Sequence, residues 1–430
     1  MLYHINGNFL KRFLLLIIWV LFVSNFIVAW AVWHVLVGGE KFNEKWSVGI
    51  IQIAKIPSQF YHVLSSNFTK ESNHLKIINS TDSITINNLK GYFLLSAVNS
   101  ENNLTEIKLI DINQNNLIKR WNLDAINFDN YEGSKEDQRF FHPLLLQGDI
   151  ITQLGGTLLR ISNNSSIIWK SKPIFHHSIE IDSDGNLWTC GTIPKNSKSK
   201  NIQSMILDDA LYKLNPLTGK IVFEKSIFNI LIENGYTNLI NYLGPITGDP
   251  IHLNDVQPAL SSGKYWEKGD LLISLRHRST VFLYRPSTNK VIWLKMGPWS
   301  FQHDCDFIND HEIGIFGNDI VIVEDKLKAK DILINGHNNQ YIYNFETDEV
   351  STPYSNMFKQ GKIKTRSEGR SRVLPDGRLL VEETNYGRIL LGDKNGLKGT
   401  YVSRLDKYHI AMLGWSRYYT REEYLQAIKK

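Results

Sequence analysis

The chain of 430 residues contains only two cysteines, Cys190 and Cys305, and no C-x-x-C pair. This scarcity excludes a cysteine-ligated zinc site and leaves two buried thiols as the simplest interpretation, with a single disulfide as the alternative. The sequence also lacks a G-x-x-x-x-G-K-[ST] phosphate loop, a G-x-S-x-G nucleophile elbow and an H-E-x-x-H zinc motif. These absences argue against a P-loop nucleotidase, an α/β-hydrolase and a zincin metalloprotease.

An excess of charge of one sign is missing as well. The formal net charge is only +5 at pH 7, and the Lys and Arg residues are scattered among acidic ones. We therefore expect no nucleic-acid partner, and the mild positive bias supports at most a preference for small anionic molecules. With 42% hydrophobic and 21% charged residues, most of the chain is expected to be globular.

One long apolar run is present near the N-terminus. Residues 13–37 read FLLLIIWVLFVSNFIVAWAVWHVLV, interrupted only by Ser24, Asn25 and His34. The run is long enough to span a bilayer as a helix, which takes about 20 residues. It exceeds the usual apolar region of a signal peptide, and no clear A-x-A cleavage site follows it. The pattern predicts an uncleaved transmembrane anchor at 13–37 after a short cytoplasmic segment, 1–12.

The composition changes twice after this run. Residues 38–90 are rich in Asn and Ser and are expected to form a linker or lead region. From 91 to 410, short apolar runs alternate with Asn, Asp, Gly and Ser turns, which is typical of an all-β domain with many short strands. In the C-terminal segment, 411–430, Thr420 and Glu423 have the spacing of a capping box and predict a terminal helix.

The all-β region contains an internal repeat. Six segments share an order of polar start, apolar strand, turn, strand, turn and a strand that ends near an aromatic residue. They begin at Gly91, Phe141, Phe175, Asp249, Phe301 and Gly369. Units of this kind are typical of propeller blades. The sequence therefore predicts an all-β fold, a six-bladed β-propeller with an N-terminal transmembrane helix, and seven blades are the alternative.

Histidines recur near the starts of these repeats. Four units have one in the first strand, at His142, His177, His252 and His303. In a propeller the first strand of each blade lines the central channel, so equivalent positions converge on one axis. A single histidine at a strand start is most often structural. Four at equivalent positions favour a shared functional site.

The residues beside these histidines suit the transfer of an anionic group. A neutral imidazole such as His303 is a nucleophile toward phosphoryl or sulfuryl groups. Strand alternation puts His252 and Asn254 on one face, which combines a proton carrier with an amide donor. The same alternation puts Arg276 and Arg278 on one face, where a guanidinium could bind an oxyanion. A structural pair between blades is the alternative role for Arg276.

Four stretches of the sequence resemble the bacterial arylsulfate sulfotransferase family. They are FQHDCDFINDHEIGIFGND from Phe301, DPIHLNDV from Asp249 with the later GDLLISLRHRSTVFLYRPSTNKVIW, FHHSIEIDSDGNLW from Phe175, and RVLPDGRLLVEETNYGRIL. The resemblance covers roughly residues 175–395. It implies a six-bladed propeller exported to the periplasm. It further implies transfer of a sulfuryl group from a phenolic sulfate ester to a phenol, without a nucleotide donor, metal or other cofactor.

The resemblance also implies roles for individual residues. His303 matches the nucleophile that becomes transiently sulfated. The other implied positions are His252, Asn254, Arg276 and His177 in catalysis, and Arg276, Asn254 and Thr384 in substrate binding, of which Thr384 is the poorest match. The doublet His176-His177 leaves open which histidine faces the channel. A small-molecule aryl sulfate and a phenolic acceptor are the implied partners. The implied location is the inner membrane, single-pass, with the propeller facing the periplasm.

Two other functions remain compatible with parts of the sequence. The phrases NPLTGKIVFE and NKVIWLK resemble blade ends of quinone-dependent propeller dehydrogenases, although no carboxylate and amide cluster for Ca²⁺ can be assembled. A non-catalytic membrane-tethered propeller scaffold is also possible, because a fold does not by itself imply chemistry. The orientation of His252, Asn254, Arg276 and His303 separates these functions, since a scaffold does not need them to face one axis.

Overall fold

The computed structural model describes residues 75–77, 86, 89–98, 105–122, 139–171, 174–193, 207–240, 248–324, 329–404 and 409–429, with scattered positions between 12 and 30. The chain divides into two units, Met1–Ser72 and Asn73–Lys430, and each is described by itself.

In the first unit, the described positions between 12 and 30 are helical, and apolar side chains such as Trp19, Phe22 and Phe26 are exposed there. The other positions of the expected anchor, 13–37, lie outside the described residues, as does most of the expected linker, 38–90. Within the part of the chain that the structure describes, no helix has the length and apolar character needed to span a membrane.

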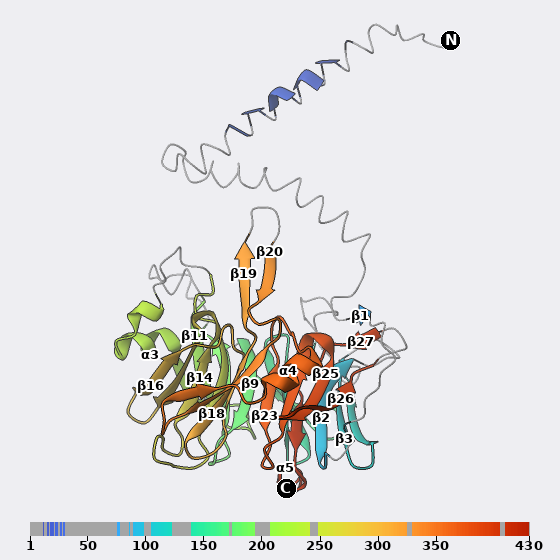
Figure 1. Ribbon diagram of the computed structural model, residues 1–430, viewed down its shortest axis with the longest axis vertical. Coiled ribbons are helices and arrows are strands. Elements are labelled where there is room, and N and C mark those ends of the chain that lie inside the picture. The colour runs from blue at the N-terminus through green and yellow to red at the C-terminus, as the bar shows by residue number, and fades with distance from the viewer. Residues whose placement is uncertain are drawn as a thin grey trace, which may run out of the picture. The chain divides into compact units, whose positions relative to one another are not determined.

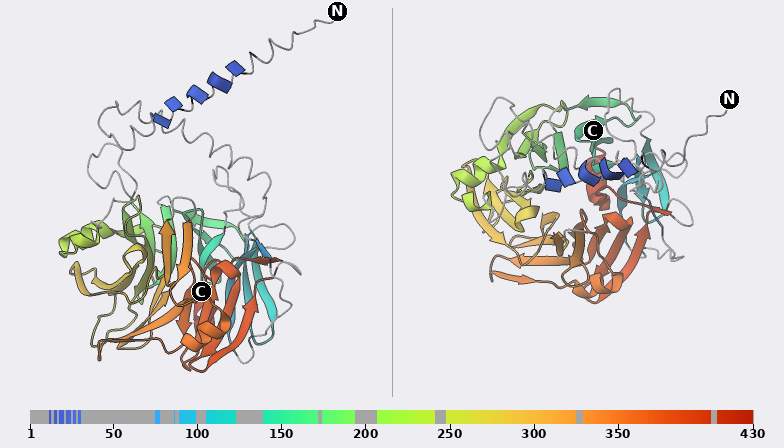
Figure 2. Two further views of the ribbon diagram at one scale, coloured as in Figure 1. Left: turned by 45° about the horizontal axis from the view of Figure 1, so that its top comes forward. Right: turned by 90° about the horizontal axis from the view of Figure 1, so that it is seen from above.

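The second unit is built from six four-stranded antiparallel sheets that surround a central axis (Figures 1 and 2). Blade 1 contains β28 (Arg417–Tyr419), β2 (Tyr92–Val98), β3 (Thr105–Asp111) and β4 (Asn116–Asn122). Blade 2 contains β5 (Phe140–Leu146), β6 (Asp149–Leu154), β7 (Thr157–Ile161) and β8 (Ile167–Lys170). Blade 3 contains β9 (Ile174–Ile181), β10 (Leu187–Thr192), β11 (Asp209–Leu214) and β12 (Ile221–Ser226).

Blades 4 to 6 follow the same order. Blade 4 contains β13 (Leu253–Pro258), β14 (Leu271–Leu275), β15 (Thr280–Arg285) and β16 (Lys290–Met296). Blade 5 contains β17 (Asp304–Phe307), β18 (Glu312–Gly317), β21 (Asn339–Asn344) and β22 (Glu349–Ser351). Blade 6 contains β23 (Arg370–Val373), β24 (Leu379–Glu383), β25 (Arg388–Asp393) and β26 (Gly396–Val402). The predicted six-bladed propeller is confirmed.

Shorter strands and helices are attached to the blades. A hairpin of β19 (Ile320–Glu324) and β20 (Ala329–Leu333) is inserted into blade 5, and β1 (Leu75–Ile77) pairs with β27 (His409–Ala411). Helix α3 (Ile227–Glu233) follows blade 3, and α4 (Ser355–Gly361) precedes blade 6. Helix α5 (Arg421–Ala427) begins with the predicted capping box, in which Thr420 accepts from the Glu423 amide.

Blade 1 joins the two ends of the propeller. Strand β28 pairs with β2, with Tyr419 opposite Tyr92, so the last strand of the chain becomes the inner strand of the first blade. The propeller therefore extends to Tyr419, beyond residue 410 where the sequence pattern placed its end. A strand of three residues is too short to show an alternating pattern, which explains the difference.

The core is divided among the junctions between neighbouring blades. Six clusters of buried apolar side chains occur among the described residues, and each joins two adjacent blades. Strand β14 shows why, because Leu271 and Ile273 pack toward blade 3 whereas Leu272 packs toward blade 5. Successive side chains of a strand point to opposite faces, so a strand between two blades is apolar on both. Cys190 and Cys305 are free thiols buried in two of these clusters.

The inner strands are joined by side chains that bind the backbone of the next blade. His142 Nδ1 accepts from the Ile179 amide at 2.8 Å, and Ser178 Oγ accepts from the Val256 amide at 2.9 Å. In the same way Asp255 accepts from the Cys305 amide, and Asp304 accepts from the Ser371 amide, both at 2.8 Å. These bonds satisfy buried backbone groups at the inner edge of each sheet. They also fix which residues of successive blades are equivalent.

Candidate active site

The candidate site lies where the first strand of a blade begins and its second strand ends. Antiparallel pairing places these two ends side by side, so both contribute side chains to the same end of the propeller axis. First strands supply His177, His252 and His303, which lie in β9 or directly before β13 and β17. The segments that follow the second strands supply Arg276 after β14 and Asn318 after β18.

Three of the predicted histidines form one cluster. The ring centroids of His177 and His252 are 5.2 Å apart, those of His177 and His303 are 6.1 Å apart, and those of His252 and His303 are 6.5 Å apart. One nitrogen from each ring lies within 4.8 Å of those of the other two. The backbone of His177 and His252 is left-handed, with φ of 62° and 56°, a conformation that costs free energy in residues other than glycine.

The fourth histidine, His142, does not join this cluster, which corrects the prediction. The hydrogen bonds between blades show that His142 is equivalent to Ser178, and that Phe141 is equivalent to His177. The register is therefore shifted by one residue, and successive residues of a strand face opposite sides. His142 instead lies beside Glu180, with 3.4 Å between its Nε2 and the carboxylate.

The side chain of Asn318 determines the tautomer of His303. The Asn318 amide group donates to the carbonyl oxygens of Thr365 and Glu368, at 3.1 and 2.9 Å, which leaves its Oδ1 as an acceptor. This oxygen lies 2.6 Å from His303 Nδ1, so Nδ1 carries the proton and donates. The lone pair of the neutral ring is then on Nε2, the nitrogen that Asn318 does not bind. Asn318 was not predicted from the sequence.

The surroundings of His303 favour its neutral form. Its side chain is 2% exposed, and burial together with the nearby Arg276 guanidinium holds its pKa well below the usual value. Burial and the neighbouring histidines also lower the pKa of His177. Both effects disfavour the imidazolium, because it would be desolvated and would lie near other positive charge.

His252 is oriented by a carboxylate that lies just before it in the chain. Its Nδ1 is 2.5 Å from Asp249 Oδ2, and its backbone amide donates to Asp249 Oδ1 at 3.1 Å. Burial raises the pKa of Asp249, but its contacts with His252 and His277 hold that pKa below the usual value. A carboxylate on Nδ1 leaves Nε2 of His252 to accept or release a proton, as in other carboxylate–histidine pairs.

Arg276 lies in a turn and not on a strand face, which corrects the predicted alternation with Arg278. The turn is a 3-10 helix, Arg276–Arg278, that follows β14 directly. The Arg276 guanidinium lies 4.7 Å from the centre of the Phe301 ring and donates to His277 Nε2 at 2.8 Å. The ring of His277 is in turn 4.5 Å from that of His252. Arg276 is thus held on the His252 side of the cluster.

Asn254 and Thr384, the remaining predicted residues, are both fully buried. Asn254 Nδ2 donates to the carbonyl oxygen of Gln302 at 2.6 Å, next to His303, and its Oδ1 has no hydrogen-bond partner among the described residues. Thr384 lies at the end of β24 in the position that Arg276 has in blade 4. Its hydroxyl donates to Glu382 at 2.8 Å and accepts from the Gly369 amide at 3.1 Å. These contacts connect blade 6 internally.

The His177 side of the site is aromatic. The half-buried ring of Phe141 lies 6.1 Å from that of His177. Trp415, buried, lies 5.1 Å from Phe141 and 5.8 Å from His177. The structure resolves the histidine doublet, because His177 contacts both His252 and His303, whereas His176 packs against His177 from behind. Trp415, from the segment before β28, was not predicted.

The charge around the cluster favours an anionic group over a metal ion. Three histidine nitrogens this close could coordinate a divalent cation. A cation there would lie near Arg276, whose charge contributes to the lowered pKa of both His177 and His303. A tetrahedral oxyanion would instead gain from the same guanidinium.

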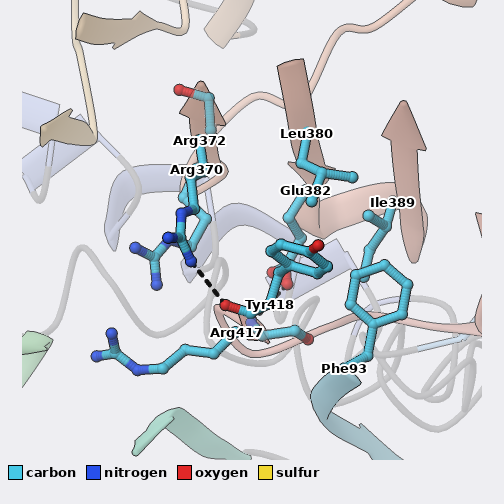
Figure 3. Close-up of a pocket in the computed structure, with 10 residues that line it drawn as sticks. Phe93, Arg370, Arg372, Leu380, Glu382, Ile389, Arg417 and Tyr418 are labelled. Carbon is cyan, nitrogen blue, oxygen red and sulfur yellow. Dashed lines mark hydrogen bonds between the residues drawn. The ribbon is translucent and has the colours of Figure 1, made fainter. Parts of the chain in front are cut away.

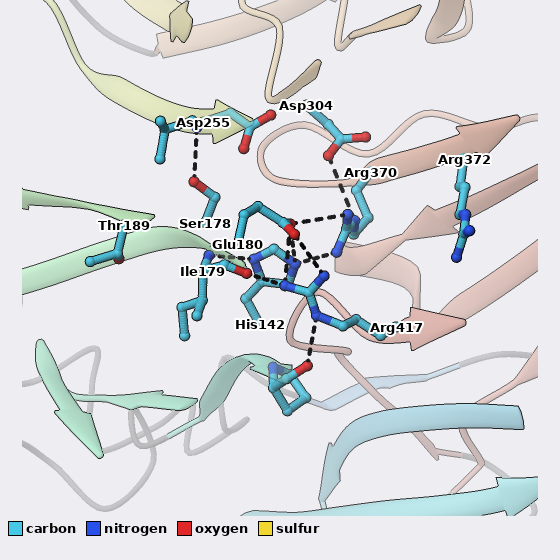
Figure 4. Close-up of polar contacts among 12 residues, drawn as sticks. His142, Ser178, Ile179, Glu180, Thr189, Asp255, Asp304, Arg370, Arg372 and Arg417 are labelled. Carbon is cyan, nitrogen blue, oxygen red and sulfur yellow. Dashed lines mark hydrogen bonds and ion pairs between the residues drawn. The ribbon is translucent and has the colours of Figure 1, made fainter. Parts of the chain in front are cut away.

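A second polar network lies on the opposite face of the inner strands. Figure 4 shows the Glu180 carboxylate among His142, Arg370 and Arg417, with an ion pair to Arg417 of 3.0 Å and one to Arg370 of 3.9 Å. Arg370 also lies 3.6 Å from Asp304. These residues connect blades 2, 3, 5 and 6 with β28, so the network holds together the strands that carry His177 and His303.

A small cavity adjoins this network between blades 6 and 1 (Figure 3). Its volume is about 60 Å³, and Arg370, Arg372 and Arg417 contribute to its lining. Arg372 already donates to the Tyr418 carbonyl oxygen at 2.8 Å and pairs with Glu423 at 2.5 Å. The cavity has room for water molecules but not for an aryl sulfate.

Comparison with known proteins identifies a family. The profile of the arylsulfotransferase (ASST) family matches residues 145–399, which is more than half of the chain. A search among curated proteins finds no match. A protein of unknown function from Bacteroides caccae is 11% identical, with 76% of this chain and 98% of that chain covered and a TM-score of 0.47. Hydrazine synthase from Kuenenia stuttgartiensis is 10% identical, with 74% and 80% covered and a TM-score of 0.39.

These two structural similarities are too distant to support any statement about the function of this chain. The family match is different in kind, because it spans the segments that carry His177, His252, Arg276 and His303. The chain belongs to the arylsulfotransferase family and is a sulfotransferase.

Proposed function

We propose that this protein moves a sulfuryl group from an aryl sulfate ester to a phenolic acceptor through a covalent intermediate on His303. One observation carries the proposal. His303 is buried, its Nδ1 is bound by Asn318, and its ring lies near those of His177 and His252. Burial and the charge of Arg276 lower its pKa and keep it neutral. A single unprotonated nitrogen beside a cation and two further imidazoles suits nucleophilic attack on an anionic ester.

The reaction has two balanced halves. In the first, His303 Nε2 attacks sulfur, an N–S bond forms, and the S–O bond to the aryl group breaks. The phenolate leaves with the electron pair of that bond and takes a proton from His252 or His177. In the second half, the acceptor phenol gives its proton to one of these histidines, and its oxygen forms a new S–O bond. The N–S bond breaks, and its electron pair returns to Nε2.

Arg276, His252 and Asn254 are assigned to the sulfuryl oxygens. The Arg276 guanidinium is the charge that lowers the pKa of His303 most, and Asn254 is hydrogen-bonded to the residue before His303. Fixed donors of this kind stabilise charge as it develops and need no reorganisation during the step. Neither a metal nor a nucleotide takes part in this scheme. Thr384 is assigned to the binding of substrate only by its resemblance to the family pattern.

The apolar run at 13–37 is proposed to anchor the protein in the inner membrane, with the propeller in the periplasm. The support is the sequence of the run itself and the resemblance to an exported family. Extraction of membranes with alkaline carbonate tests the anchor. The protein should stay in the pellet, and its release into the supernatant would contradict a spanning segment. Reporter fusions after residue 430 should be active only in the periplasm.

Transfer itself is tested with the full chain in detergent, 4-nitrophenyl sulfate as donor and phenol as acceptor. Nitrophenolate release that depends on phenol, and that is lost in His303→Ala, is the expected result. Phenol-dependent release that persists in His303→Ala would contradict the proposal. A non-catalytic scaffold would show no release with any donor, and the convergence of His177, His252 and His303 supports the enzyme over that alternative.

A further inference from the structure

Behind His177 lies a chain of two more ionisable side chains. Nδ1 of His177 is 2.9 Å from Nδ1 of His176, and Nε2 of His176 is 3.4 Å from Oδ1 of Asp209. Asp209 is 2% exposed, and its other oxygen, Oδ2, accepts from the Leu253 amide at 2.7 Å. His176 Nε2 and Asp209 Oδ1 are both buried, and neither has a hydrogen-bond partner among the described residues, so the 3.4 Å contact between them is an ion-pair contact and not a hydrogen bond.

The order of these groups determines where the protons are. Asp209 can only accept, and its negative charge favours the tautomer in which the nearby buried Nε2 of His176 carries the proton. His176 Nδ1 is then an acceptor, and His177 Nδ1 donates to it. The unprotonated nitrogen of His177 is therefore Nε2, and the same ring lies in the cluster with His252 and His303.

The surroundings of His177 and His252 differ in a way that separates their roles. His252 lies beside His277 and Arg276, which favour the charged sulfuryl oxygens. His177 lies beside the half-buried, uncharged ring of Phe141, which can pack against an aryl group. The other nearby phenylalanine, Phe301, has the Arg276 guanidinium 4.7 Å from its ring centre, closer than the 5.9 Å between Arg139 and the ring of Phe141. A phenolic oxygen between the aryl group and the sulfur would thus lie next to His177.

We propose that His177 is the general base for the acceptor phenol, with His176 and Asp209 as positioning residues that take up its proton. This inference rests on the proposed function. The phenol proton passes to His177 Nε2, and the proton on His177 Nδ1 passes to His176 Nδ1. His176 becomes an imidazolium beside the Asp209 carboxylate. The phenol oxygen bonds to sulfur as the bond to His303 Nε2 breaks. In the donor half-reaction the same proton returns to the leaving phenolate.

Asp209→Asn tests the proposed roles of His176 and Asp209, because it should reverse the tautomers of both His176 and His177. The Asn oxygen can still accept from the Leu253 amide, so its amide group then donates to His176 Nε2. His176 Nδ1 must carry the proton and donate to His177, which leaves the proton of His177 on Nε2, where it cannot act as a base.

Two half-reactions are measured in the full chain. Without acceptor, the initial release of nitrophenolate from 4-nitrophenyl sulfate should stay close to wild type in Asp209→Asn, because this leaving group needs little protonation. Transfer to phenol should fall by roughly 10²- to 10⁴-fold, the usual contribution of a positioned base. Transfer to a phenol that is already ionised at the assay pH should be largely retained. Equal losses in both half-reactions, or unchanged transfer to phenol, would overturn the proposal.

Asp249→Asn is the matched control, because Asp249 contacts a ring nitrogen of His252 as Asp209 contacts one of His176. It should slow both half-reactions, since His252 contacts the sulfuryl group in each. A loss confined to phenol transfer in Asp249→Asn, with Asp209→Asn normal, would move the base to His252 and overturn the proposal. If Asp209→Asn does not fold, His176→Gln replaces it, since the His176 side chain is 23% exposed, and the same selective loss is expected. A wild-type protein without initial release would refute the proposed function itself.

Discussion

Asn318 Oδ1 lies 2.6 Å from His303 Nδ1, and the Asn318 amide group is held in place by two backbone carbonyl oxygens. The contact joins the end of one strand of blade 5 to the start of its neighbour. It keeps the proton of His303 on Nδ1 and leaves Nε2, the proposed nucleophile, unprotonated. The tautomer of His303 is thus a consequence of how a blade is folded.

Replacing Asn318 by Ala should slow transfer by roughly 10- to 100-fold, the usual effect of removing a partner that orients a functional histidine. Initial rates with 4-nitrophenyl sulfate and phenol measure this. Asn338→Ala is the control, because Asn338 donates to the Asn318 and Thr365 carbonyl oxygens in the same loop cluster but has no contact with His303. It should lower the free energy of unfolding by about 1–3 kcal/mol and leave the rate per folded molecule unchanged. Equal rate losses in both variants would assign Asn318 a structural role only.

Arg276→Lys should lower kcat/KM for the sulfate donor by roughly 10²- to 10³-fold, because an ammonium group cannot reproduce the forked donors of a guanidinium. Steady-state kinetics with 4-nitrophenyl sulfate at saturating phenol measure this. Arg285→Lys provides the comparison, since Arg285 makes a two-pronged contact with Asp270 on the outer part of blade 4. Its kinetics should match wild type. A normal kcat/KM in Arg276→Lys would exclude Arg276 from sulfuryl binding.

The rate of enzyme sulfation should be insensitive to mild acid. The pKa of His303 is held well below its usual value by burial and by Arg276, so the nucleophile stays unprotonated as the pH falls. Stopped-flow measurement of the initial nitrophenolate release between pH 8 and 6 should give a flat profile. A release rate that falls with a midpoint at or above about 6.5, the ordinary histidine value, would contradict a depressed pKa at the nucleophile.

Stability should fall as the pH rises through 7 to 8 because of three carboxyl groups on the inner strands. Burial and mutual repulsion raise the pKa of Asp255 and Asp304 to about 7, and that of Asp306 to about 8. Between about pH 4 and these values the folded state binds more protons than the unfolded state, so the free energy of unfolding decreases with increasing pH. Asp306→Asn removes one of these groups.

The loss of thermal stability between pH 6 and 8.5 should therefore be smaller in Asp306→Asn than in wild type. Thermal unfolding followed by circular dichroism measures the difference. Asp376→Asn is the control, because Asp376 is exposed and its contact with Arg378, which stays charged throughout, lowers its pKa. It should behave as wild type over this pH range. An identical pH dependence in Asp306→Asn and wild type would show that the raised pKa does not contribute to stability.

The sequence predicts the blades well because each strand carries its own signal. Short apolar runs between turn residues repeat six times, and the interfaces between blades require apolar side chains on both faces of strands such as β14. His177, His252 and His303 could be found since they stand at the starts of such runs. Strand β28 could not, because a three-residue strand has no period to recognise.

Register and loop contacts limit what the sequence can show about the site. His142 and His177 look equivalent by spacing, but a bulge in each inner strand shifts them by one residue onto opposite faces. Asn318 lies at the end of the neighbouring strand of blade 5 and Trp415 lies just before β28 in blade 1, so no local pattern connects them to His303 or His177. Of the site residues that were not predicted, Asp249 is the one that a local sequence signal could have revealed. It is a carboxylate only three residues before His252, a candidate acid or base.

The most direct test of the account is the isolation of the covalent intermediate. The full chain is mixed with 4-nitrophenyl sulfate without acceptor, quenched in alkali, and digested for peptide mass mapping. We expect one SO₃ group per active site, bound to the imidazole of His303 and removed when phenol is added before the quench. Transfer of sulfate to phenol at full rate with no sulfated histidine, or with the label on His177 or His252 instead, would contradict His303 as the nucleophile.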